Sequence, residues 1–168
     1  MSTSRKSHCR SPFSEDAEQT FGKGWCRAGL GGVEGKDRGR IKAKDTRRIL
    51  GSVNINERYE KEEPDASRWD CVVGYLSAPA PRAYFIEFHP ANQEDIKEVK
   101  KKKEWLDGKL TSSAFADDSR WTVSFHWVVS SDKKREGKAP VRFTKDYALR
   151  ELKGTGIKFE GRGPLKLE

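Results

Sequence analysis

The sequence RWDCVVGY at residues 68–75, followed by AYFIEFHP at residues 83–90, decides the expected fold. Both runs are rich in β-branched and aromatic residues, and SAPAP at residues 77–81 separates them, which predicts two strands joined by a turn. Pro90 ends the second strand, and Asn92 is a suitable N-cap for the lysine-rich helix that follows. This strand pair and its helix form the centre of the predicted domain.

Further elements are expected on both sides of this centre. Residues 49–55 are predicted to be extended, and residues 57–63 to form a short helix. Residues 120–129 alternate between apolar and polar types, which is the strongest strand signal in the chain; a helix at 145–153 and a strand at 157–159 follow. The central strands should pair antiparallel, whereas crossovers through helices favour parallel pairing later. We therefore expect an α/β (α+β) fold, a single three-layer domain with a mixed sheet flanked by helices.

The N-terminal part of the chain offers few apolar residues. Residues 1–20 are mostly polar and charged and are predicted to form a disordered arm, which leaves residues 21–168 as the single domain. Within that domain, residues 21–48 are first glycine-rich and then basic. The glycines lack the spacing of a phosphate-binding loop, so an irregular loop is predicted, with Trp25 and Leu30 holding it against the core.

Composition limits the class of protein. With 168 residues, 34% hydrophobic and 36% charged, the chain has material for one domain with a small core. The net charge of +8 is compatible with a polyanionic partner, or simply with a basic, soluble surface. No run of about eighteen apolar residues predicts a membrane span, and no apolar core of a signal peptide follows Met1. The odd count of three widely spaced cysteines fits reduced thiols in a cytoplasmic protein.

Two acids occupy unusual places in the central strands. Asp70 opens the first strand, and Glu87 interrupts the apolar run of the second. Facing side chains on paired strands lie roughly 5 Å apart, so these carboxylates are candidates to share a divalent cation such as Mg²⁺. Ordinary explanations stay open: Asp70 pairs with Arg68 or Arg82, Glu87 faces solvent, and His89 merely ends its strand.

The four consecutive lysines of the following helix differ in their angular positions. At 100° per residue, Lys103 falls on the apolar face of the helix and Lys102 at the edge of that face, whereas Lys100 and Lys101 lie outside it. An ammonium group on an apolar face is costly to desolvate unless a carboxylate meets it. We therefore expect Lys103, or failing that Lys102, to approach the acids; alternatively, Lys103 extends past the core edge into solvent.

These residues and their order resemble the restriction-endonuclease-like nucleases, the PD-(D/E)XK superfamily, over roughly residues 56–129. In that resemblance Asp70 matches the metal-binding acid, and Glu87 matches the acid of the (D/E)XK element. His89 stands where that element has lysine, and Trp69 stands where the PD element has proline. Some members of the superfamily supply the missing lysine from the following helix.

The resemblance implies a metal-dependent nuclease that uses Mg²⁺ or Mn²⁺ to hydrolyse phosphodiester bonds. It implies the catalytic residues Asp70, Glu87, His89, Lys102 and Lys103, and the metal ligands Asp70, Glu87, Glu57 and Glu60, the last two as candidates for the helix glutamate of some members.

Basic clusters supply candidate contacts to the phosphates of a nucleic acid. The residues singled out are Arg38, Arg40, Lys42, Lys44, Arg47, Arg48, Lys133, Lys134 and Arg135. The alternative to a nuclease is a catalytically inactive module of the same fold that binds nucleic acid or another protein.

Overall fold

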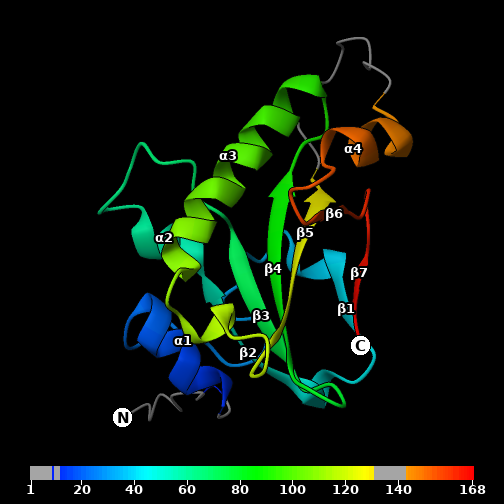
Figure 1. Cartoon of the computed structure of the whole chain (residues 1–168). Coiled ribbons are helices and arrows are strands. Elements are labelled where there is room, and N and C mark those ends of the chain that lie inside the picture. The colour runs from blue at the N-terminus through cyan, green and yellow to red at the C-terminus, as the bar shows by residue number, and fades with distance from the viewer. Residues whose placement is uncertain (1–8, 10–11, 131–142) are drawn as a thin grey trace.

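A mixed sheet of five strands forms the centre of the structure, a computed structural model that describes residue 9 and residues 12–130 and 143–168 (Figure 1). Its strands, in spatial order, are β2 (Ile49–Asn54), β3 (Cys71–Tyr75), β4 (Arg82–His89), β5 (Thr122–Val129) and β6 (Ile157–Phe159). The first three pair antiparallel, and β4, β5 and β6 pair parallel. The predicted antiparallel central pair and the later parallel pairing are therefore confirmed.

The α-helices pack into the apolar core on one face of this sheet. They are α1 (Phe13–Phe21), α2 (Ile55–Tyr59), α3 (Gln93–Leu110) and α4 (Lys145–Glu151). Apolar side chains of all four join one core cluster with sheet residues such as Val72 and Phe85. The predicted mixed α/β class, with helices against a mixed sheet, is confirmed. Short 3₁₀ turns complete the chain: η1 (Arg38–Arg40), η2 (Thr46–Arg48) and η3 (Ala114–Ala116).

The opposite face of the sheet is covered by a second, two-stranded sheet. It consists of β1 (Ile41–Ala43) and β7 (Leu165–Leu167), which pair parallel. Leu165 and Leu167 pack into a separate core cluster with β3 and β4 residues such as Val73 and Ile86. The sequence analysis does not single out these two strands of three residues each, whose pairing joins distant parts of the chain.

Helix α1 contradicts the prediction that residues 1–20 form a disordered arm, which is wrong for residues 13–20. The helix buries three apolar side chains at helical spacing, Phe13, Ala17 and Phe21. A Cβ atom added at Gly74 in β3 would lie 2.3 Å from the Phe13 ring, so only glycine admits this close approach. Three well-placed apolar residues are enough to dock this otherwise polar segment.

The buried carboxylate of Asp16 pairs with the half-exposed Arg120 and fixes the same helix to the start of β5. Asp16 is 1% exposed and accepts hydrogen bonds from both the Arg120 guanidinium, at 2.6 Å to each oxygen, and the Trp121 indole nitrogen, at 2.7 Å. Both oxygens of the Asp16 carboxylate therefore have hydrogen-bond donors 104 or 105 residues away in the sequence, and the composition of residues 1–20 does not indicate this pairing.

The cysteines differ from the sequence-based expectation. Cys9 and Cys26 form a disulfide with a Cα–Cα distance of 6.1 Å, so the prediction of reduced thiols is wrong for this pair. Cys71 in β3 is a free, buried cysteine. Within the described part of the chain, no helix combines the length and apolarity needed to cross a membrane.

Helix α3 begins as the sequence predicts. The Asn92 side chain accepts hydrogen bonds from the backbone N–H groups of Glu94 and Asp95, and the Asp95 carboxylate accepts one from the Asn92 N–H. This capping box sets the start of α3 directly after β4. The start of the helix also fixes the angular positions of its lysines relative to β3 and β4.

Candidate functional site

Asp70 and Glu87 lie next to each other where β3 begins and β4 nears its end. Cys71 pairs with Ile86, so Asp70 lies opposite Glu87 in the next row. The Asp70 N–H donates to Glu87 Oε2 at 3.1 Å, and the Phe88 N–H donates to Asp70 Oδ2 at 2.8 Å. Glu87 is completely buried, at 0% exposure. Each carboxylate is thus held by a backbone N–H group of the neighbouring chain segment.

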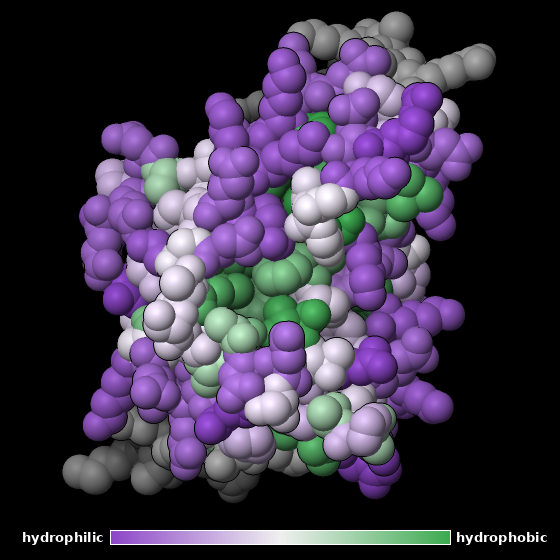
Figure 2. Space-filling model, in the orientation of Figure 1, coloured by the Kyte–Doolittle hydropathy of each residue, from purple (hydrophilic) through white to green (hydrophobic). Residues whose placement is uncertain are grey.

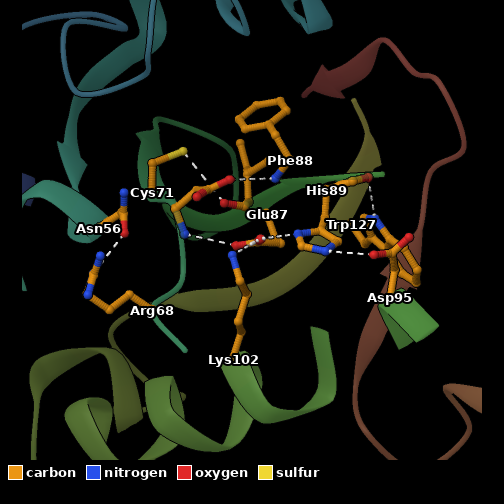
Figure 3. A network of polar contacts seen from close by, with 11 residues as sticks. Asn56, Arg68, Cys71, Glu87, Phe88, His89, Asp95, Lys102 and Trp127 are labelled. Atoms are coloured by element: carbon orange, nitrogen blue, oxygen red, sulfur yellow. Dashed lines mark hydrogen bonds and ion pairs between the residues drawn. The ribbon is translucent and has the colours of Figure 1, made fainter. Parts of the chain in front are cut away.

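Lys102 of α3 meets the second oxygen of Glu87. Its Nζ forms an ion pair and a hydrogen bond with Glu87 Oε1, and His89 Nδ1 lies 3.4 Å from the same oxygen. Figure 3 shows these side chains converging from β4 and α3. Of the two lysines named from the sequence, the structure brings Lys102 to the acids.

Lys103 does not approach the acids, so the first choice made from the angular count is wrong. Its side chain is buried, but Nζ pairs with Asp107 Oδ1 at 2.7 Å and lies 4.0 Å from the centroid of the Phe125 ring. A carboxylate one turn away and an aromatic face together stabilise this ammonium group. Lys101 is exposed and Lys100 partly exposed.

His89 bridges two acids, Glu87 and Asp95. Its Nε2 lies 3.1 Å from Asp95 Oδ1, while Nδ1 faces Glu87. The Trp127 indole N–H donates to the His89 carbonyl at 3.0 Å, which fixes the backbone as well. His89 therefore connects Glu87 to the start of α3 through Asp95, a residue that the sequence did not single out.

Burial and crowding change the ionisation of the site. Burial, and then the negative charge of Glu87, raise the pKa of Asp70 to about 8. Burial opposes the charges of Lys102 and His89, but the interactions of these two groups with Glu87 outweigh it and raise the pKa of each. At neutral pH the site therefore has a protonated Asp70 beside a lysine that holds its charge.

Asp70 also lines a polar pocket of about 210 Å³. The loop before η1 contributes Glu34 and Asp37 to its wall, and Asn54 and Asn56 line it from the start of α2. Asp37 is 6% exposed, and burial raises its pKa. The sequence did not single out Asp37, whose one distinguishing feature is that it is an acid within a basic segment.

The two candidate helix glutamates do not join this site. Glu57 and Glu60 are exposed on and just after α2, and neither lines the pocket beside Asp70. Within residues 9, 12–130 and 143–168, no three His, Cys, Asp or Glu side chains are grouped so as to hold one metal ion. Neither candidate for the helix glutamate therefore lies beside Asp70 and Glu87, because both side chains are exposed to solvent.

Two of the predicted phosphate-binding arginines have structural partners. Arg40 Nη1 donates to the Val129 carbonyl at 3.0 Å, and Arg40 Nε lies 3.5 Å from Asp37. Arg38 Nε donates to the Val33 carbonyl at 2.8 Å. These bonds hold the basic segment against the sheet, so Arg38 and Arg40 are in part occupied by the fold itself.

The other basic candidates are exposed or lie outside the described residues. Lys42, Lys44, Arg47 and Arg48 are exposed, and Arg47 pairs with Asp45. Lys44 and Arg48 line a pocket of about 460 Å³ together with Arg82, at the end of the β3–β4 pair opposite to Asp70. Lys133, Lys134 and Arg135 lie outside the described residues.

Comparison with known proteins gives no relative: no family model, no curated protein and no solved structure matches the chain.

Proposed function

We propose that the protein is a metal-dependent nuclease that hydrolyses phosphodiester bonds of nucleic acid. The observation that supports this most is the meeting of Lys102 with Glu87, directly beside Asp70. An acid on each of two paired strands, with a lysine from the next helix, is the arrangement expected from the resemblance to the PD-(D/E)XK superfamily. The order of elements, β3, β4, α3 and β5, agrees with that resemblance.

In this proposal Asp70 and Glu87 would be the protein ligands of Mg²⁺ or Mn²⁺. Mg²⁺ is commonly bound by only one or two carboxylates together with water and substrate phosphates, so two acids suffice. Burial, and then the negative charge of Glu87, raise the pKa of Asp70, and a bound cation would favour its ionised form. Once bound, the metal would lower the pKa of a coordinated water and stabilise negative charge on the phosphate.

The remaining groups of the site act by charge and position. Lys102 places a positive charge beside the acids, where it would stabilise charge that develops on the scissile phosphate. His89 is a positioning residue: it contacts Glu87 through one ring nitrogen and Asp95 through the other. This bridge holds the Glu87 carboxylate between β4 and α3.

A nucleic-acid partner and a cytoplasmic location belong to the same proposal. The net charge of +8 and the exposed Lys42, Lys44 and Arg48 support binding to phosphates. The Cys9–Cys26 disulfide weighs against the cytoplasm, where disulfides are rare. Thiol counting on protein trapped directly in cells, with free thiols alkylated before lysis, tests the location: three alkylated cysteines support it, and one argues for an oxidising compartment.

Cleavage of labelled single- and double-stranded DNA and RNA tests the activity. The wild-type protein should cleave at least one of these with Mg²⁺ or Mn²⁺ and stop when a chelator is added. Glu87→Gln and Lys102→Ala should abolish cleavage, whereas Lys101→Ala, the exposed neighbour on the same helix, should retain it. A pure wild-type protein that cleaves none of the substrates with either metal would exclude the nuclease.

A second candidate is an inactive module of the same fold that binds nucleic acid or a protein. The pocket lined by Lys44, Arg48 and Arg82 favours nucleic acid, because these three cations outnumber the two acids in its lining, Asp45 and Glu168. Figure 2 also shows an apolar area in the middle of one face, bordered by hydrophilic side chains, which favours a protein partner. Steeply salt-dependent binding without cleavage would support the nucleic-acid module.

A further inference from the structure

His126 in β5 has a hydrogen-bond partner on each ring nitrogen. Nδ1 lies 2.7 Å from Glu160 Oε1, and Nε2 lies 2.7 Å from Ser124 Oγ. The histidine is 4% exposed, so neither contact is a loose surface interaction. A hydroxyl, an imidazole and a carboxylate therefore form one continuous chain across β5 and the end of β6.

This chain of groups lies apart from the Glu87–Lys102 site. Phe125 and Trp127, which alternate with Ser124 and His126 along β5, pack into the core cluster shared with the helices. Ser124 and His126 therefore face the opposite side of the sheet, where the His126 ring lies 5.5 Å from that of Tyr84. The site proposed for phosphodiester hydrolysis does not use these groups.

The carboxylate of Glu160 determines which nitrogen of His126 carries the proton. The hydrogen bond from His126 lowers the pKa of Glu160, so the carboxylate is ionised at neutral pH and only accepts. A neutral imidazole must then have its proton on Nδ1, facing Glu160, and a free electron pair on Nε2. Ser124 consequently donates its hydroxyl proton toward Nε2, as an activated nucleophile does toward its base.

We propose that Ser124 is a nucleophile that reacts with small carboxylic esters, with His126 as general base and Glu160 as the residue that orients the imidazole. Ser124 Oγ forms a bond to the acyl carbon while its proton moves to His126 Nε2. The alcohol leaves with the electron pair of the broken ester bond and takes that proton. Water then attacks the acyl-serine by the same route, releasing the carboxylic acid and restoring the serine.

The strand arrangement leaves Ser124 more accessible than its base. β6 pairs with Phe125, His126 and Trp127, and its register does not extend to Ser124. Ser124 is accordingly only partly buried, whereas His126 is buried. The partly exposed hydroxyl is the point at which the proposal places the ester, and the imidazole stays shielded from bulk water.

Labelling with a fluorophosphonate probe and turnover of p-nitrophenyl acetate test the proposal. We expect one covalent adduct, located on Ser124 by peptide mass spectrometry, and its loss in Ser124→Ala and His126→Gln. Glu160→Gln keeps the imidazole in place and should slow labelling by about 100-fold. Thr122→Ala is the matched control, because Thr122 is an exposed hydroxyl on the same strand and face and has no such base; it should label like the wild type.

Two results would overturn the proposal. One is the absence of a Ser124 adduct from the wild-type protein, and the other is equal labelling of wild-type protein and folded Glu160→Gln and His126→Gln variants. Far-UV circular dichroism establishes that each variant is folded. Neither result depends on whether the protein cleaves nucleic acid.

Discussion

Asp70 should make the protein less stable as the pH rises, and Asp70→Asn should remove this effect. The pKa of Asp70 is about 8 in the folded protein against an ordinary value of 3.8. A carboxyl group with a raised folded-state pKa contributes full stability below its unfolded pKa, and that contribution is lost as the pH rises toward the folded value. The loss therefore falls between about pH 4 and about pH 8.

The size of the effect follows from the shift in pKa. Each unit is worth about 1.4 kcal/mol, so between about pH 5 and about pH 8 the wild type should lose about 4 kcal/mol relative to Asp70→Asn. Asparagine imitates the neutral acid, because its carbonyl oxygen can still accept the hydrogen bond from the Phe88 N–H. In the Asp70→Asn variant no group ionises at this position, so burial and the charge of Glu87 no longer lower the stability there as the pH rises.

Urea unfolding at several pH values, with a chelator present, measures the effect. The difference in free energy of unfolding between Asp70→Asn and wild type should grow with pH and level off above about pH 8. Asp65→Asn removes one carboxylate from the exposed loop before β3 and serves as the control, with a difference that stays nearly constant. A constant difference for Asp70→Asn as well would refute the inference that Asp70 is protonated at neutral pH.

Four further outcomes are expected. Asp16→Ala leaves the buried Trp121 indole N–H without its acceptor, whereas the half-exposed Arg120 can turn to water, so urea unfolding should show a destabilisation of about 1–3 kcal/mol. Lys102→Ala leaves the buried Glu87 with His89 as its remaining ion-pair partner and should cost about 3 kcal/mol by the same assay, whereas Lys101→Ala should change stability by less than about 0.5 kcal/mol. Mn²⁺ binding, followed by calorimetry, should weaken at least tenfold in Glu87→Gln if the acids hold a cation. Reduction of the Cys9–Cys26 disulfide should lower the free energy of unfolding by about 3 kcal/mol, measured with and without reductant.

The elements with a clear local pattern were predictable from the sequence. The two apolar runs around the SAPAP turn form β3 and β4, and the alternation of residues 120–129 forms β5. Asn92 caps α3 as its side chain and position suggested. In each case the signal is short in range, since it depends on periodicity, on proline or on a capping side chain.

Features that depend on distant partners were not predictable. α1 has few apolar residues, and its docking depends on Gly74 and on the Asp16–Arg120 ion pair. The angular count placed Lys103 and Lys102 on or near the right face of α3, but Asp107 and Phe125 decided which of them turned to Glu87. The Ser124–His126–Glu160 chain gave no signal, because Glu160 lies 34 residues beyond His126.

The Asp16–Arg120 ion pair has a consequence for the order of folding. Its partners are 104 residues apart in the chain, so a ribosome must synthesise β4 and α3 before Asp16 of α1 can meet its donor Arg120. Contacts that close so long a loop form slowly, because the chain loses conformational entropy on closing the loop before the contacts contribute any stability. Helix α1, which is made before Arg120, therefore reaches its native place late, and until then its three apolar side chains are exposed to solvent and to chaperones.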